Sequence, residues 1–292
     1  NNRKIFRNRS KIIFKIREIL NEKGFIEVET PVLQNLHGGA SARPFKTHHN
    51  ALDQDFYLRI AEELYLKRLL VGGFEKIYEI GKNFRNEGID RTHNPEFTML
   101  ELYEAYSDVS DMMKLCENLI KSICSELNID SVNFMNETIK LSKSFNKVSM
   151  QELFKNEFDC DVLSLDSKNL YDMCIEYKVD VDKKMTYGQL FDKLFSSIIE
   201  PKLIQPTFVF DYPKAISPLA KVHRNDDRLA ERFELFIAGM EFANAFSELN
   251  DPIDQKKRFE DQLELLKSGD DEAHQMDIDF IESMEIGMPP TG

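Results

Sequence analysis

The sequence has 292 residues, 42% of them hydrophobic, which is enough to bury one large domain or one domain with an insertion. No stretch approaches the roughly 20 apolar residues that a membrane span needs, and the polar start of the chain lacks the apolar segment of a signal peptide. The net charge of −13 argues against a domain that grips nucleic acid unaided, but it suits cationic ligands and magnesium.

The cysteines form no CxxC pair and have no spacing typical of a metal site. We therefore expect free thiols, a reducing cytoplasmic location and no zinc centre. The cysteines are Cys116, Cys124, Cys160 and Cys174.

Periodicity predicts five elements in the first third of the chain. Residues 8–21 have the spacing of an amphipathic helix, and residues 25–31 alternate like a strand that ends at a proline. A helix over 62–70 precedes strands over 76–84 and 97–106. Because these two strands follow each other directly, they are expected to form an antiparallel hairpin.

The rest of the chain alternates helices with short strands, and this predicts an α+β fold with a mainly antiparallel sheet. Residues of about 130–205 are expected to form an inserted helical subregion. The predicted elements are a helix over 107–127, short strands over 128–148, helices after capping boxes at Ser149 and Thr186, a strand over 207–211, two strands over 232–249 broken near Gly239, and a helix over 254–267.

The common glycine-rich phosphate loops and the GxSxG nucleophile motif do not occur. A reaction driven by positioning and charge stabilisation would not need them. Two glycines, Gly38 and Gly39, allow close approach of the backbone to a ligand, although by themselves they indicate only a loop.

The segment from Phe84 to Phe97 carries the first candidate site. Arg85 ends a strand, where its planar fork could bind two phosphate oxygens. Glu87 could accept from an adenine amino group or reach a metal through water, and His93 or Phe97 could stack on a purine. A salt-bridged hairpin with a polar loop is the simpler interpretation for Arg85 alone.

A second candidate site lies on the following strand, where Phe97, Met99, Glu101 and Tyr103 share one face. A carboxylate and a phenol on an otherwise apolar face are costly unless each has a partner. A glutamate beside a tyrosine is a natural receptor for an ammonium group.

The third candidate site is near the end of the chain, where Asn244, Phe246 and Glu248 are expected to share a strand face. Glu234 and Glu241 are candidate magnesium ligands, although a surface position remains open for Glu234. The residues alone thus indicate a soluble enzyme with an acidic pocket, a phosphate-directed arginine and room for a cationic substrate.

The sequence resembles class II lysyl-tRNA synthetases along its whole length. The aspartyl and asparaginyl relatives carry different residues after the arginine of motif 2. The matching segments are motif 1 (24–31), motif 2 (84–88, 93–97 and 101–103) and three lysyl-specific segments (38–40, 217–221 and 246–251).

The resemblance implies that lysine attacks ATP to give lysyl-adenylate, from which the 3′ end of tRNA(Lys) takes the lysyl group. Magnesium would be the cofactor and ATP the co-substrate. By this resemblance, Gly39 and Glu63 would bind the α-amino group of lysine, and Asn244 would lie near its carboxylate. The ε-ammonium group would be received by Glu101, Tyr103 and Glu248, and Phe246 would pack on the aliphatic stem. ATP would be bound by Arg85, Glu87, His93, Asn94 and Phe97, with Arg85 as the catalytic residue, and magnesium would be bound by Glu234 and Glu241.

The family pattern also predicts features beyond single binding residues. A homodimer through residues 12–31 is expected, and tRNA(Lys) would be held mainly by an N-terminal anticodon-binding barrel that the sequence lacks. The arginine of motif 3 would follow Gly292, so the catalytic domain over 1–292 is expected to be impaired. Glu62 and His37 stand where the family often has proline.

Two alternatives remain open at this point. A stand-alone paralogue attaches lysine to a translation factor and shares motif 2, but the segments at 38–40 and 246–251 follow the synthetase pattern. A non-catalytic lysine- or nucleotide-binding protein on the same fold is the other alternative, and the retained contact residues argue against it.

Overall fold

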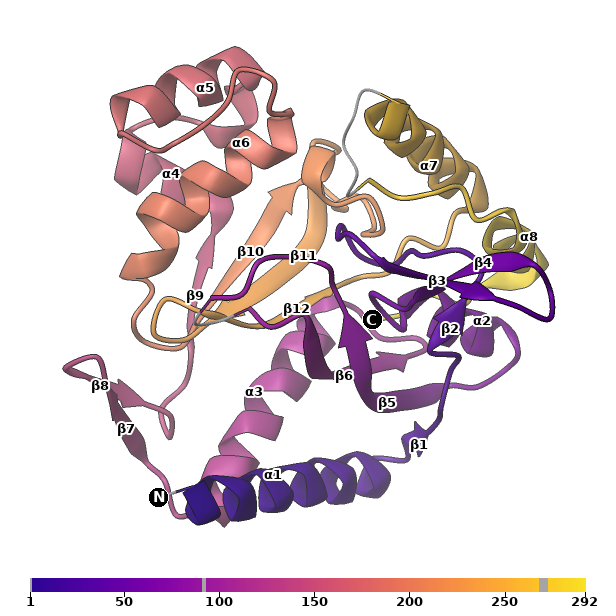
Figure 1. The fold of residues 1–292 in the computed structure, drawn as a ribbon. Coiled ribbons are helices and arrows are strands. Elements are labelled where there is room, and N and C mark those ends of the chain that lie inside the picture. The colour runs from indigo at the N-terminus through magenta and orange to yellow at the C-terminus, as the bar shows by residue number, and fades with distance from the viewer. Residues whose placement is uncertain (1, 91–92, 268–272) are drawn as a thin grey trace. The chain divides into compact units, whose positions relative to one another are not determined.

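A computed structural model describes residues 2–90, 93–267 and 273–292. The chain divides into two compact units, and each is described by itself. The first unit comprises residues 1–16 and 108–247, and the second comprises residues 17–107 and 248–292. Figure 1 shows the helices and strands of both, beginning with α1 (Asn2–Glu22).

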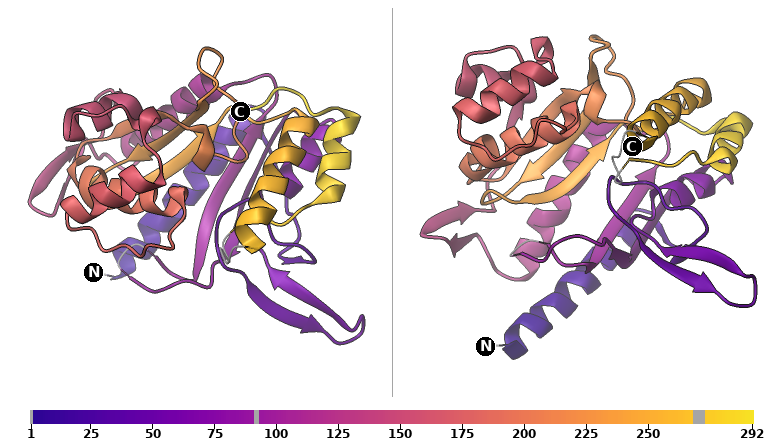
Figure 2. Two further views of the ribbon diagram at one scale, coloured as in Figure 1. Left: turned by 90° about the horizontal axis from the view of Figure 1, so that it is seen from above. Right: turned by 45° about the horizontal axis from the view of Figure 1, so that its top comes forward.

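The second unit contains two small sheets and three helices of its own. One sheet has the order β1-β5-β6 and the other has the order β2-β4-β3. The helices α7 and α8 pack against each other, as both views of Figure 2 show. The elements are β1 (Ile26–Glu27), β2 (Leu33–Gln34), β3 (Phe45–His49), β4 (Gln54–Leu58), α2 (Glu63–Val71), β5 (Lys76–Phe84), β6 (Glu96–Glu104), α7 (Pro252–Lys267) and α8 (Ile278–Gly287).

The antiparallel hairpin of β5 and β6 is the longest ladder of the second unit, and the prediction of a hairpin is confirmed. Glu101 lies directly opposite Glu79, and Met99 lies opposite Gly81. Paired residues of a ladder project to the same side of the sheet. The face predicted for β6 therefore continues across β5, and it brings two glutamates next to each other.

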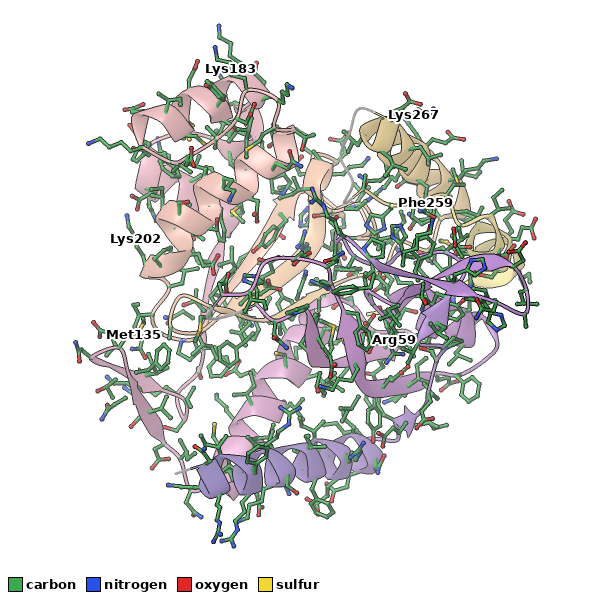
Figure 3. The ribbon with its side chains drawn as sticks, viewed as in Figure 1. Arg59, Met135, Lys183, Lys202, Phe259 and Lys267 are labelled. Atoms are coloured by element: carbon green, nitrogen blue, oxygen red, sulfur yellow. The ribbon has the colours of Figure 1, made fainter. Side chains whose placement is uncertain are left out.

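Gly81 leaves the space that the side chain of Arg59 occupies on this face. A Cβ atom at position 81 would lie 2.0 Å from Nη2 of Arg59. Arg59 is 1% exposed, and its Nε donates to the carbonyl oxygen of Lys82 at 3.0 Å, beside the β5–β6 hairpin (Figure 3). The absence of a side chain at 81 thus allows an arginine to be buried over the sheet.

Replacing Gly81 with Ala is therefore expected to lower the free energy of unfolding by about 1–3 kcal/mol, because the methyl group displaces the Arg59 guanidinium. Urea denaturation measures this change. Gly88→Ala is the matched control, since a Cβ there meets nothing within 4 Å. Equal stability of the two variants would contradict the proposed packing.

The first unit is built on a four-stranded sheet of order β12-β11-β10-β9, in which β9 and β10 are parallel and the other neighbours antiparallel. A two-stranded hairpin, β7–β8, lies apart from it. The elements are α3 (Val109–Glu126), β7 (Ser131–Phe134), β8 (Glu137–Lys140), β9 (Asn146–Ser149), α4 (Met150–Phe158), α5 (Ser167–Glu176), α6 (Tyr187–Leu194), β10 (Thr207–Pro213), β11 (Leu229–Phe236) and β12 (Glu241–Phe246), with short 3₁₀ or π turns at 162–164, 195–199, 200–202 and 214–216.

Helices α4, α5 and α6 share a hydrophobic core with the sheet, and Figure 1 shows them gathered on one side of β10. Phe154 stacks on Phe191 with ring centroids 5.3 Å apart, and Val209 of β10 and Phe236 of β11 join the same cluster. The apolar spacing of these helices is therefore explained by burial against one sheet face.

Most predicted elements occur, but the expected strand over 25–31 needs correction. It is reduced to Ile26–Glu27, because only these residues pair with the edge of β5. The Val28 amide still donates to the carbonyl of Tyr78 on β5 at 2.9 Å, and the Thr30 amide donates to the Glu79 side chain instead of continuing the ladder. In the part of the chain that is described, no helix is long and apolar enough to cross a membrane.

Candidate functional site

A cluster of buried ionisable side chains lies in the second unit, around the start of α2 and the β5–β6 hairpin. We call it the acidic cluster. It holds more carboxylates than cations, and most of its members are buried. Its members are the carboxylates Glu62, Glu63, Glu79, Glu101 and Glu248, the cations Arg59 and Lys67, and the phenol Tyr103.

Lys67 joins two carboxylates from distant parts of the sequence. Its ammonium group lies 2.5 Å from Oε1 of Glu63, one turn earlier on α2, and also contacts Oε2 of Glu248. Burial lowers the pKa of Lys67, but the charges of Glu248 and Glu63 outweigh burial and raise it to about 12. Burial raises the pKa of Glu248 to about 8, against the attraction of Lys67.

Arg59 neutralises the charge of two other carboxylates of the acidic cluster, Glu79 and Glu62. Its Nη1 donates to Oε1 of Glu79 at 2.6 Å, and Nη2 lies 3.3 Å from Oε1 of Glu62. The other oxygen of Glu79 accepts from the amide and hydroxyl of Thr30, at 3.0 and 2.8 Å. Oε2 of Glu62 accepts from Nδ2 of Asn83 at 2.6 Å. Each of these buried carboxylates thus has a cation and a neutral donor.

Glu101 differs from the other carboxylates because its contacts are neutral. The Tyr103 hydroxyl donates to Oε1 at 2.6 Å, and the Glu62 amide donates to Oε2 at 3.3 Å. Burial raises the pKa of Glu101 well above its ordinary value, and the charges of Glu62 and Glu63 raise it further. Burial and the charge of Glu101 also raise the pKa of Tyr103. Unlike the other carboxylates of the acidic cluster, Glu101 is partly exposed.

The loop with Gly38 and Gly39 lies against the start of α2. Gly39 has a φ of +85°, and a Cβ atom there would meet the Cβ atoms of Glu63 and Ala61 at 3.0 and 3.1 Å. A Cβ at Gly38 would lie 2.8 Å from Cδ1 of Leu64. The glycines therefore permit close approach to α2, and Gly39 lies beside Glu63, the residue with which it is predicted to share a role.

Arg85 lies at the end of β5 and covers an aromatic ring. Its guanidinium carbon is 5.2 Å from the ring centroid of Phe97, and its Nε lies 3.4 Å from the carbonyl oxygen of Ile60. The Arg85 amide donates to the carbonyl of Pro95 at 2.9 Å and closes the loop between the strands. The arginine and the phenylalanine predicted to bind ATP are thus adjacent.

The other predicted ATP-binding residues line the exposed part of this loop. Glu87 is exposed and its amide donates to the carbonyl of Arg85 at 2.9 Å. Nδ1 of His93 lies 2.7 Å from Oδ2 of Asp90, and Nδ2 of Asn94 donates to the carbonyl of Glu96. These contacts order the polar loop, and they leave open the prediction that its side chains meet a nucleotide.

The first unit carries the two predicted magnesium ligands on β11 and β12. Oε1 of Glu234 accepts from Nη2 of Arg232 at 2.5 Å, and Oε2 accepts from the Tyr212 hydroxyl at 2.7 Å. The Arg232 guanidinium lies 4.7 Å from the centroid of the Tyr212 ring. Burial lowers the pKa of Arg232, but Glu234 above all, and then Tyr212 and Glu241, raise it overall.

Asn244 and Phe246 are on β12, opposite Glu234 and Arg232 respectively. Oδ1 of Asn244 accepts from Nε of Arg232 at 3.1 Å. The expectation that Glu248 shares their strand face is wrong, because β12 ends at Phe246. The Glu248 amide donates instead to the carbonyl of Thr291 at 2.8 Å, within the second unit.

A family model described as tRNA synthetases class II (D, K and N) matches residues 1–292. The chain belongs to the class II tRNA synthetases. This agrees with the α+β fold and with the antiparallel hairpin of β5 and β6, whose first strand is followed directly by Arg85.

Curated relatives of this synthetase chain are named lysine--tRNA ligase. The one from Pelotomaculum thermopropionicum is 54% identical over 294 residues, which cover 99% of this chain and 58% of the relative. The one from Shouchella clausii is also 54% identical, with the same coverage. The one from Roseiflexus sp. is 52% identical and covers 99% of this chain and 60% of the relative. The chain thus spans less than two thirds of these relatives.

Sequence reasoning missed Arg59, Glu62, Glu79 and Lys67 as members of the acidic cluster, and it missed Arg232 as the partner of Glu234 in the first unit. One signal was available for Lys67, which lies four residues after Glu63 on a helix rich in leucine. A lysine at that spacing can pair with the glutamate on the buried face. The pairing of Arg59 across the hairpin depends on Gly81, and it has no comparable signal in the local sequence.

Proposed function

We propose that the protein activates L-lysine with ATP to form lysyl-adenylate and transfers the lysyl group to the 3′ end of tRNA(Lys). The observation that carries the proposal is the acidic cluster, in which Glu101 and Tyr103 form an anionic contact without a cation of their own among the described residues. The names of the relatives support lysine as the amino acid.

Recognition of lysine rests on residues of the second unit. Gly39 and Glu63 would hold the α-amino group, and Glu101, Tyr103 and Glu248 would receive the ε-ammonium group. A buried ammonium requires carboxylate partners, and a substrate that lacks it would leave those carboxylates unpaired. Lys67 offsets the charge of Glu63 and Glu248, while the contacts of Glu101 are neutral. Glu101 is therefore the carboxylate best suited to the substrate's charge.

The chemistry needs positioning and charge stabilisation. The lysine carboxylate oxygen bonds to the α-phosphorus of ATP, and the bond to pyrophosphate breaks. Arg85 would bind phosphate oxygens, and its position over Phe97 supports a place where an adenine ring can stack. A ribose hydroxyl of tRNA then attacks the lysyl carbonyl, and AMP leaves. By the resemblance to lysyl-tRNA synthetases alone, Asn244 and Phe246 would help hold the carboxylate and the aliphatic stem.

Magnesium fits the carboxylates Glu234 and Glu241 of the first unit. Glu234 lies on β11 opposite Asn244, and Glu241 lies on β12 opposite Phe236, so the two carboxylates belong to adjacent strands. Magnesium is commonly held by one or two carboxylates together with substrate phosphates and water. When bound there, the ion would neutralise charge on the ATP phosphates. Arg232 and Tyr212 would hold Glu234 in one orientation.

The partners follow from the same proposal. Ile5, Phe6 and Phe14 of α1 expose large apolar side chains, which supports a second copy of the chain as the partner of this region.

The four cysteines are free thiols, which suits a reducing cytoplasm. The proposal also makes tRNA(Lys) a partner, as the acceptor of the lysyl group.

Titration calorimetry with L-lysine, and with norleucine as the uncharged analogue, tests the proposal. Lysine is expected to bind, and norleucine is expected to bind at least about 100-fold more weakly, because it cannot pair with Glu101 and Glu248. Circular dichroism before the titration shows that the chain is folded. A folded chain that binds neither compound, or both equally, would contradict lysine as the substrate.

A further inference from the structure

Lys67 connects the two carboxylates that are proposed for opposite ends of the substrate. Its ammonium group lies 2.5 Å from Oε1 of Glu63 and also contacts Oε2 of Glu248. The proposed function assigns Glu63 to the α-amino group of lysine and Glu248 to its ε-ammonium group. A cation of the protein itself therefore links the acceptors of both ammonium groups.

The other buried cation of the acidic cluster has different partners. Arg59 contacts Glu62 and Glu79, and neither of these carboxylates has a proposed contact with the substrate. The two cations thus divide the carboxylates between them, and Lys67 is the one whose partners belong to the proposed lysine site.

Glu63 and Glu248 come from segments that are far apart in the sequence. Glu63 is the first residue of α2, whereas Glu248 follows β12 and its amide donates to the carbonyl of Thr291 at 2.8 Å. Lys67 is one helical turn after Glu63, so the two side chains lie on the same face of α2. Through Lys67 the carboxylate of Glu248 is tied to this helix.

Lys67 can hold both carboxylates and still leave them able to bind a substrate. Its side chain is 0% exposed, and although burial lowers its pKa, the charges of Glu248 and Glu63 raise the pKa to about 12, so the ammonium form persists at pH 7. A carboxylate has two oxygens and about four lone-pair sites. Glu63 and Glu248 can therefore accept from Lys67 and from a second ammonium group at the same time.

We propose that Lys67 is a positioning residue of the lysine site, whose ammonium group holds Glu63 and Glu248 where they accept the two ammonium groups of the substrate. The inference rests on the proposed function and adds a residue that acts through these carboxylates without touching the substrate. Two carboxylates that share a buried site without a cation repel each other, so one of them takes up a proton or turns away. Either change removes an acceptor for an ammonium group.

The expected signature is a loss of selectivity and not only of affinity. Norleucine has the α-amino group and an aliphatic stem, but it lacks the ε-ammonium group. Lysine depends on the placement of both Glu63 and Glu248, whereas norleucine depends on that of Glu63 alone. A change that merely damages the fold weakens both ligands alike, so the ratio of their affinities separates positioning from a structural role.

Titration calorimetry with lysine, and with norleucine in competition, tests the inference on Lys67→Met, which keeps an apolar stem but not the charge. The preference for lysine over norleucine is expected to fall by about tenfold or more relative to wild type, because a charged hydrogen-bond partner is lost. Lys67→Arg, which keeps the charge, should retain most of the preference. Lys76→Met is the matched control, because Lys76 is partly exposed and pairs with Glu104.

A measurement on wild-type protein decides the matter even if Lys67→Met does not fold. Lys67 is the one buried lysine among the described residues, so its slowly exchanging ammonium group can be recognised by isotope-edited NMR of the lysine side chains. Unlabelled lysine should shift this signal by more than norleucine does, since lysine adds a second cation to Glu248.

Three results would overturn the inference: an unchanged preference in folded Lys67→Met, an equal loss for both ligands, or an ammonium signal that lysine leaves unmoved. In each case, a wild-type protein that still prefers lysine would continue to support the proposed function. If folded wild-type protein binds lysine no better than norleucine, the proposed lysine specificity fails, and this inference fails with it.

Discussion

Replacing Glu101 with Gln is expected to weaken lysine binding by about 100-fold at pH 7, because a hydrogen bond to a charged group contributes about 1.5–3 kcal/mol. The amide has nearly the same shape as the carboxyl group, but it cannot carry the negative charge that an ammonium group requires. Titration calorimetry with lysine measures the change. Affinity for norleucine should change little, so the preference for lysine should largely disappear.

The same variant separates binding from folding. The variant removes a carboxylate from a cluster with excess negative charge. Above pH 7, the free energy of unfolding should therefore stay unchanged or rise. Glu104→Gln serves as the control, since it removes a charge from the opposite face of the same strand. A Glu101→Gln protein that binds lysine within twofold of wild type would show that Glu101 does not receive the ammonium group.

The placement of the proposed ammonium receptor, Glu101 with Tyr103, was predictable because strand periodicity is a local property. Glu101 and Tyr103 are two residues apart on a strand with apolar neighbours, so they had to project to one buried face. The structure confirms the face and the hairpin, and it adds a hydrogen bond of 2.6 Å between the two side chains. A short segment of sequence was therefore enough to predict that Glu101 and Tyr103 lie together in the proposed site.

The cations of the cluster could not be found in the same way. Arginine and lysine are usually exposed, and a sequence does not show which ones are buried. Lys67 is buried because Glu248 approaches it from a segment far along the chain, and Arg59 is buried because Gly81 provides space on a strand of the hairpin. Both facts depend on tertiary packing.

The incorrect placement of Glu248 has a similar cause. Alternation along 241–248 suggested one strand, but Phe246 is the last residue of β12 that pairs with β11. The Ser247 amide donates to the carbonyl of Glu231, and the next amide donates to Thr291. The side-chain pattern continues through this change of partner, so it could not reveal where the strand ends.

Replacing Lys67 with Met is expected to lower the free energy of unfolding by about 3–5 kcal/mol at pH 8, the cost typical of removing one partner of a buried ion pair. Two carboxylates, Glu63 and Glu248, would lose their shared cation. Urea denaturation measures the loss. Lys76→Met is the matched control, because Lys76 forms a half-exposed ion pair with Glu104 and should cost about 1 kcal/mol or less.

The pH dependence of stability gives the sharper test of this arrangement. Glu248 has its pKa raised from 4.5 to about 8, so the folded state holds more protons than the unfolded state between these values, and stability should fall as pH rises through that window. Lys67 has its pKa raised from 10.5 to about 12, so its contribution is complete below 10.5 and is lost as pH approaches 12. Lys67→Met should abolish the alkaline loss and steepen the fall between pH 5 and 8, because both carboxylates then become harder to ionise. A variant that keeps the wild-type pH profile would show that Lys67 does not neutralise the acidic cluster.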